Sequence, residues 1–210
     1  MTSKNPKGFF ARNLKGDRQT SLNSPGDITR LYMSVTAAML ARDFARASRL
    51  LENATPAEKE RDMVPFFDGM VARAQHNAAR ARSSFQFLRD RVATKLRERP
   101  HDAELTSDLS MADAGLGLKE NALREAKRAI ELCPVSRDAV DGPFYETMLA
   151  LVYAMTGEHD AALTQLEQIV RLPRGPDYGE LRFDPLLDEI RTDPRFDRLL
   201  SQAALPPVYE

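Results

Sequence analysis

Two stretches in the second half of the chain carry the same residue types at the same spacing. In 103–134 and in 143–173 a leucine and a small residue are followed by a glycine and then by small or apolar residues. Small residues let two helix backbones approach closely, and a glycine adopts the left-handed turn that ends a helix. The pattern therefore predicts helical hairpins. It constrains the fold strongly, because each hairpin leaves an apolar face that only the next hairpin covers.

The shared markers can be read at fixed positions. In the first stretch they are Leu109, Ser110, Gly117, Ala122, Ala126, Ala129, Leu132 and Pro134; in the second they are Leu149, Ala150, Tyr153, Gly157, Ala162, Leu166, Leu172 and Pro173. Two weaker copies start at residues 28 and 62, and in the second of these Pro65 and Asp68 occupy positions that are usually large and apolar. The sequence thus predicts four hairpins, over 28–61, 62–100, 103–134 and 143–173.

This pattern resembles the tetratricopeptide repeat (TPR), most closely over 103–134 and 143–173. The resemblance implies an all-α fold, a right-handed α-solenoid of about four TPR-like hairpins. Over about 28–200 the chain also resembles the TPR region of bacterial multidomain signalling and regulatory proteins, where the repeats are fused to nucleotide cyclase, protein kinase or winged-helix domains. The residues before the first hairpin are too few for such a domain, so we expect no effector activity.

The sequence also predicts the structure of the two ends of the chain and of one long helix. Residues 1–26, rich in Lys, Arg, Ser, Asn and Gly, are expected to form a flexible basic arm. Residues 78–99 predict one long helix ended by Pro100. In 177–210, the pairs Asp184-Pro185 and Asp193-Pro194 each predict a helix start, because Asp is a favourable N-cap and Pro fits the first helical position. These short helices are expected to cap the solenoid.

Composition excludes several classes of protein. The single cysteine, Cys133, rules out an internal disulfide scaffold. A hydrophobic fraction of 42% with 29% charged residues is close to that of a packed globular domain. The longest apolar run, 148–155, is far shorter than the ~20 residues that cross a bilayer, and residues 1–17 contain no secretory core. We therefore expect a cytoplasmic protein that does not span a membrane.

Residues that usually carry catalysis or bind metals are few and scattered. The three histidines are all expected in turns, without the spacing of metal ligands: His76, His101 and His159. Cys133 at an apolar helix end is typical of a buried structural thiol. Gly115 and Gly117 lack the preceding strand and the Gly-Lys-Ser/Thr ending of a phosphate-binding loop. We expect no catalytic residue, no metal site and no cofactor.

In TPR proteins the first helix of each hairpin lines a concave groove that binds peptides, and the resemblance carries those positions over to this chain. The mostly apolar set expected to contact a partner is Tyr32, Thr36, Met39, Met63, Phe66, Met70, Arg73, Met111, Thr147, Leu151 and Met155. Flexible methionine side chains suit a surface that accepts apolar or amphipathic segments. Any single residue of this stripe is equally compatible with packing between helices, whereas the set as a whole favours a binding groove. Glu104 and Asp108 stand where chaperone-binding relatives hold a terminal carboxylate, so that mode is not expected.

The net charge of −1 hides a division along the chain, because residues 1–100 carry +9 and residues 101–210 carry −10. Much of the positive charge lies on the arm and on a basic helix over 73–99, whose cations are Arg73, Arg80, Arg82, Arg89, Arg91, Lys95, Arg97 and Arg99. An alternative function is therefore a nucleic-acid-associated accessory protein that contacts phosphates through these residues. Phe85, Phe87 and Leu88 interleave at core-facing spacing, which favours a solvated structural helix.

The sequence thus predicts a non-catalytic interaction module or scaffold that binds an apolar or amphipathic segment of a protein partner. The basic arm, or a second copy of the chain in a homodimer, are the other candidates for filling the groove. The sequence does not identify the partner.

Overall fold

The computed structural model describes residues 28–207; the expected basic arm over 1–26 lies outside this range. Within it the chain is all-helical, as predicted, with eleven α-helices, one 3₁₀ helix and no strand. The helices that begin the successive pairs are α2 (Ile28–Leu40), α5 (Met63–Ala74), α7 (Ala103–Gly115) and α9 (Gly142–Met155). Their partners are α3 (Phe44–Glu52), α6 (Ala78–Glu98), α8 (Lys119–Leu132) and α10 (His159–Ile169).

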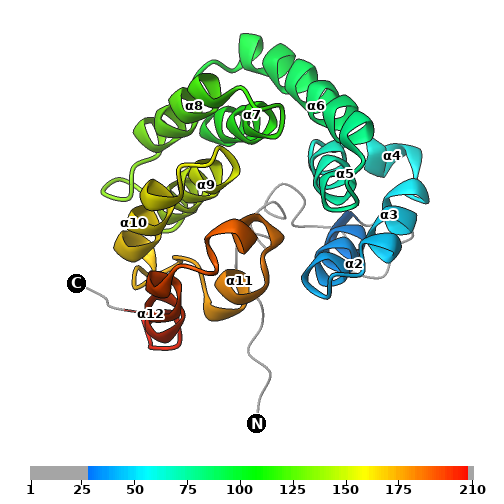
Figure 1. Ribbon diagram of the computed structural model, residues 1–210. Coiled ribbons are helices and arrows are strands. Elements are labelled where there is room, and N and C mark those ends of the chain that lie inside the picture. The colour runs from blue at the N-terminus through cyan, green and yellow to red at the C-terminus, as the bar shows by residue number, and fades with distance from the viewer. Residues whose placement is uncertain (1–27, 208–210) are drawn as a thin grey trace.

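The helix pairs follow one another along a curved row. Figure 1 shows α2, α5, α7 and α9 on the inner side of the arc, and α3, α6, α8 and α10 on its outer side. Each pair contacts the next through α3 and α5, α6 and α7, and α8 and α9. A short helix, α4 (Pro56–Lys59), joins α3 to α5. No helix within 28–207 combines the length and the apolar character that crossing a bilayer requires.

The turns inside the four pairs have the same backbone. One residue in each adopts a positive φ: Arg42 at 60°, His76 at 57°, Gly117 at 76° and Gly157 at 78°. The N–H that follows donates to a carbonyl five residues earlier, as in Leu118 to Asp113 at 2.8 Å and Asn77 to Ala72 at 2.8 Å. These bonds satisfy carbonyls that the helix end leaves free. The four turns are therefore equivalent, although only two of them contain the favoured glycine.

The long helix expected over 78–99 is present as α6, and Phe85 is its central contact. This side chain is fully buried and lies between Gly69 of α5 and Gly115 of α7. A Cβ added to either glycine would lie within 2.8 Å of the phenyl ring. The missing side chains therefore provide the space that the ring fills, and Phe85 joins the second helix pair to the third.

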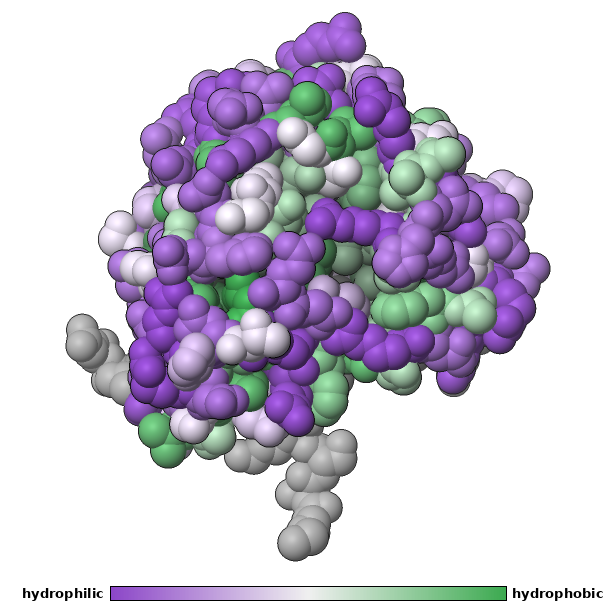
Figure 2. Space-filling view, in the orientation of Figure 1, coloured by the Kyte–Doolittle hydropathy of each residue, from purple (hydrophilic) through white to green (hydrophobic). Residues whose placement is uncertain are grey.

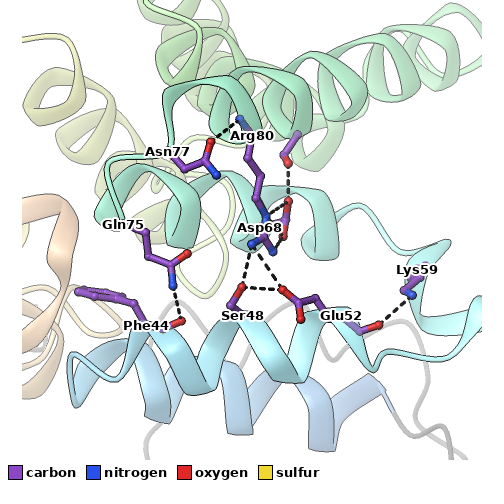
Figure 3. A network of polar contacts seen from close by, with 9 residues as sticks. Phe44, Ser48, Glu52, Lys59, Asp68, Gln75, Asn77 and Arg80 are labelled. Carbon is purple, nitrogen blue, oxygen red and sulfur yellow. Dashed lines mark hydrogen bonds and ion pairs between the residues drawn. The ribbon is translucent and has the colours of Figure 1, made fainter.

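A polar network explains why Asp68 departs from the repeat pattern. Arg80 donates to the Asp68 carboxylate through Nε at 3.1 Å and through a terminal nitrogen, and to Ser48 at 2.8 Å. Ser84 also donates to Asp68, at 2.5 Å. Figure 3 shows that these side chains come from α3, α5 and α6 and point toward one another, with Glu52 bonded to Ser48. Asp68 thus links the first two helix pairs where an apolar residue was expected.

The two Asp-Pro pairs begin helices as predicted. Asp184 accepts a hydrogen bond from the Leu186 N–H at the start of the 3₁₀ helix η1 (Pro185–Ile190), and Asp193 accepts one from the Arg195 N–H at the start of α12 (Pro194–Ala203). With α11 (Tyr178–Phe183) these elements form the C-terminal segment, which contacts α9 and α10. It therefore covers the last helix pair.

The contact of Phe85 with two glycines leads to a stability prediction. Gly115→Ala is expected to lower the free energy of unfolding by about 1–3 kcal/mol, because the new methyl group overpacks the site. Phe85→Leu in the same chain should restore part of the loss, measured by urea unfolding. Gly179→Ala is the matched control, because its nearest neighbour is a side-chain oxygen at 3.2 Å. A Gly115→Ala effect that is independent of residue 85 would contradict this packing.

Candidate interaction surface on the inner side of the arc

The inner face is defined here as the side of α2, α5, α7 and α9 turned toward the centre of the arc (Figure 1). The structure places most of the eleven predicted contact residues of this face in the core. Eight of them are buried: Tyr32, Thr36, Met39, Met70, Met111, Thr147, Leu151 and Met155. Met63 and Phe66 are half-buried, and Arg73 is exposed. As the chain is folded, only these last three offer much surface to a partner.

The burial of α9 has a clear cause. This helix contacts α7, α8, α10 and η1, and its residues are buried at nearly every position. On η1, Leu187 and Ile190 are each 2% exposed and belong to the same apolar core as Leu151 and Met155. The C-terminal segment therefore occupies the inner face of the last helix pair. Burial of these residues also indicates that part of the methionine stripe serves helix packing.

Phe66 lies at the junction between the apolar clusters that form the core. Its ring lies 5.7 Å from Phe67 and 6.4 Å from Phe85, measured between ring centroids. Phe67 in turn packs edge-on against Tyr32 of α2 at 5.4 Å. Phe66 also borders all three apolar clusters of the core. The structure thus brings together Tyr32 and Phe66 from separate helix pairs, whereas Met39 and Met155 belong to different clusters.

Ion pairs join the C-terminal segment to the start of the row. Arg42, in the turn between α2 and α3, makes two hydrogen bonds with the Asp188 carboxylate of η1, one of them at 2.6 Å. A terminal guanidinium nitrogen of Arg73 lies 3.8 Å from Oε1 of Glu189. The other carboxylate oxygen of Glu189 lies 3.4 Å from Nε2 of His159 of α10. Burial opposes ionisation of Asp188, but hydrogen bonds from Arg42 and Arg191 outweigh it and lower the pKa of the carboxyl. We call the Arg42–Asp188 and Arg73–Glu189 pairs the latch.

Sequence reasoning missed the latch. One signal was available, because Arg42 occupies a turn position where the stronger repeats carry glycine. A left-handed backbone costs a non-glycine residue about 1 kcal/mol or more, so an arginine there is a departure that its side chain can explain. Nothing local to η1 indicated its distant partners.

Arg191 organises the C-terminal segment. Its guanidinium donates to three backbone carbonyls, those of Leu181 at 2.7 Å, Arg182 at 2.5 Å and Asp184 at 2.6 Å. It also lies 5.4 Å from the centre of the Phe196 ring, within the range of a cation–π contact. One side chain thus links α11, η1 and α12.

The basic helix expected over 73–99 is wrong at its start, because a turn at His76 ends α5 and leaves Arg73 on that helix, so the basic helix is α6 alone. Its cations are largely engaged with carboxylates. Pairs form between Arg80 and Asp68, Arg89 and Asp113, Arg91 and Asp62, Lys95 and Asp62, and Arg99 and Asp102. Arg82 and Arg97 are the exposed members for which no such pair occurs within the described chain. Phe87 was expected to face the core, but it is 57% exposed and lies beneath Arg91. Successive residues of a helix point in different directions, so Phe87 faces away from the apolar stripe that Phe85 and Leu88 form.

Groups that typically bind metals do not converge in the described residues: no cluster of three or more His, Cys, Asp or Glu side chains is present there. A scan against protein-family models and a search of curated proteins both found no match to this chain.

The contribution of the Arg42–Asp188 pair to stability can be measured by comparing glycine substitutions in two equivalent turns, one at Arg42 and one at His76. His76→Gly is expected to raise the free energy of unfolding by about 1 kcal/mol, because glycine relieves the left-handed backbone. Arg42→Gly gains the same relief but loses the pair with Asp188, so its net gain should be smaller by up to about 1 kcal/mol, the usual scale of an exposed ion pair. Chemical unfolding at low and high salt measures both. Equal gains in the two variants would show that the pair contributes nothing.

The two Asp-Pro caps are expected to respond oppositely to pH. Burial raises the pKa of Asp184 to about 6, against hydrogen bonding from the Leu186 N–H and the charge of Arg191. The folded chain therefore holds this proton more tightly than the unfolded chain, whose Asp pKa is about 3.9. The resulting stability is fully present below about pH 4 and is lost as the pH rises through 6.

Asp184→Asn should keep the cap and remove this pH dependence. At pH 7 the variant is expected to be more stable than the native chain by up to about 3 kcal/mol, and at pH 4 the two should be equal. Asp193 is the control, because hydrogen bonds from Arg195 lower its pKa to about 2. Asp193→Asn should therefore destabilise at pH 7. Urea unfolding across pH 4–7 checks both; parallel profiles for Asp184→Asn and the native chain would disprove the assignment.

Proposed function

We propose that this chain is a TPR-like right-handed α-solenoid of four hairpins that acts as a non-catalytic protein–protein interaction module. Its inner face binds an apolar or amphipathic segment of a partner. The four equivalent turns support the repeated architecture. The observation that carries the function is the packing of η1 against α9, because here the inner side of the row already accommodates a short apolar segment of polypeptide.

The part of the inner face that remains accessible lies on α5 and α7. Met63 and Phe66 are half-buried there and provide apolar surface, while Arg73 and Glu104 are exposed. The C-terminal segment covers the corresponding side of α9. Figure 2 shows a mostly hydrophilic surface on which hydrophobic residues appear in separate patches. A partner that matches this surface therefore presents both apolar and charged side chains.

Site-specific photo-crosslinking tests the proposal. A benzophenone amino acid replaces Met63 or Arg73 on the inner side, and Arg82 or Arg97 on the outer side of α6, each in the full chain. Irradiation in a lysate of the native host should give discrete protein adducts from the two inner positions only. Circular dichroism confirms that each variant is folded.

The outer positions serve as the matched controls, because they are exposed and their side chains make no ion pair within the described chain. Protein adducts of equal yield from all four positions would contradict an inner binding face. Nuclease-sensitive adducts from Arg82 and Arg97 would instead support the alternative of a nucleic-acid-associated protein.

A further inference from the structure

One short element, η1, touches both ends of the curved row of helices. Figure 1 shows the C-terminal segment between α9 and α2. Leu186 of η1 is half-buried and packs against two apolar clusters, one that contains α9 and one built mainly from α2, α3 and α5. Asp188 and Glu189 of η1 form the latch with Arg42 and Arg73. A leucine and two carboxylates of η1 are thus seated on the first two helix pairs.

The two sides of this contact are held with different strength. Leu187 and Ile190 of η1 are almost fully buried against the last helix pair. The side chains of the latch are exposed instead, the two arginines by 41% and 43% and the two carboxylates by 45% and 62%. Exposed ion pairs contribute little free energy, so the contact of η1 with α2 and α5 opens far more easily than its contact with α9.

Opening this contact affects its two sides unequally. Asp188 keeps an ion pair with Arg191 at 3.1 Å. Within residues 28–207 the side chains of Arg42 and Arg73 make no hydrogen bond or ion pair other than those of the latch. When η1 leaves, two cations therefore lose their partners beside an apolar cluster. Carboxylates next to apolar side chains are the groups that would replace what is lost.

The surface that η1 contacts on α2 and α5 is held by its own helices. Arg42 belongs to the turn that the Asp43 N–H closes by donating to the Ala38 carbonyl at 2.9 Å. Arg73 lies in the last turn of α5, and Phe66, two turns earlier, is on the same face of that helix. Phe66 is half-buried and borders the apolar cluster of α2 and α5. We call Arg42, Arg73 and Phe66 the acceptor surface; a ligand finds it already in place, which lowers the cost of binding.

We infer that the acceptor surface binds an acidic amphipathic segment of a separate protein, and that η1 is the intramolecular competitor of this segment. The carboxylates of the ligand pair with Arg42 and Arg73 in place of the two carboxylates of η1. Its apolar side chains lie against Phe66. A tethered competitor has a high effective concentration, so η1 excludes ligands that bind weakly. This inference rests on the proposed function and specifies its ligand.

The test measures binding of two labelled peptides to the full chain by fluorescence anisotropy at low salt. One is an amphipathic leucine–glutamate peptide, and the other is its leucine–lysine counterpart. The glutamate peptide should bind and the lysine peptide should not. Arg42→Gln combined with Arg73→Gln should weaken binding of the glutamate peptide about tenfold, the scale of two exposed ion pairs.

Substitutions on the other side of the same ion pairs should have the opposite effect. Asp188→Asn combined with Glu189→Gln weakens the competitor, so the glutamate peptide should bind about fivefold more tightly than it binds the native chain. Both double variants break the latch, and a purely structural role of the latch would change binding in the same direction in both. Opposite changes are therefore specific to competition between η1 and the peptide.

Matched variants on α6 control for net charge. Arg82→Gln with Arg97→Gln removes the same positive charge as the acceptor-surface variant, and Asp90→Asn with Glu98→Gln removes the same negative charge as the η1 variant, all at exposed positions. Neither should change binding of the glutamate peptide, and circular dichroism confirms that each variant is folded. Equal losses in the two arginine variants, or equal gains in the two acidic ones, would overturn the inference.

Two further outcomes would also contradict the inference. Light scattering tests whether η1 of a second copy is the ligand: dimerisation of the native chain at high concentration, lost in the Arg42→Gln, Arg73→Gln variant, would overturn the assignment to a separate protein. A strict monomer supports it. If the glutamate peptide does not bind even the Asp188→Asn, Glu189→Gln chain while the inner photo-crosslinks persist, this inference is wrong and the proposed function stands.

Discussion

The continuity of the helical row depends on a steric fit between one large side chain, Phe85, and two glycines that leave room for it. Phe85 of α6 fills the space that Gly69 and Gly115 leave on α5 and α7, so a single ring contacts the other helix of its own pair and the first helix of the next pair. Protein interiors are packed as densely as organic crystals, and a fit of this kind fixes the spacing of the elements on either side. The inner face exists because α5 and α7 are held side by side.

Charge on α6 reinforces the same junction. Arg80 holds Asp68 of α5, Arg91 and Lys95 hold Asp62 at the start of α5, and Arg89 holds the nearly fully buried Asp113 of α7. A buried carboxylate is tolerated only when it is paired, since an isolated one is strongly destabilising. The basic residues of this helix therefore have a structural role, because they pair with carboxylates of α5 and α7. This role weakens the case for phosphate binding.

The C-terminal segment combines a firm and a weak attachment. Leu181, Leu187 and Ile190 are almost fully buried against the last helix pairs, whereas the latch to α2 and α5 consists of partly exposed ion pairs. Burial of several apolar side chains contributes far more free energy than exposed pairs do. The segment is thus a fixed part of the C-terminal half, and the contact between the two ends of the arc is the weaker one.

Sequence alone determined the paired helices, the left-handed turns at Gly117 and Gly157, and the Asp-Pro starts of η1 and α12, because spacing and backbone preference are local properties. It did not predict the short helices α4 and α11. Tertiary structure decided the rest. Whether a methionine such as Met111 is buried, and which carboxylates remain unpaired, depends on segments far away in the chain. Identical caps at Asp184 and Asp193 differ in burial and in charged neighbours, and so their pKa values shift in opposite directions. Periodicity identifies a helix face, but only packing determines what covers it.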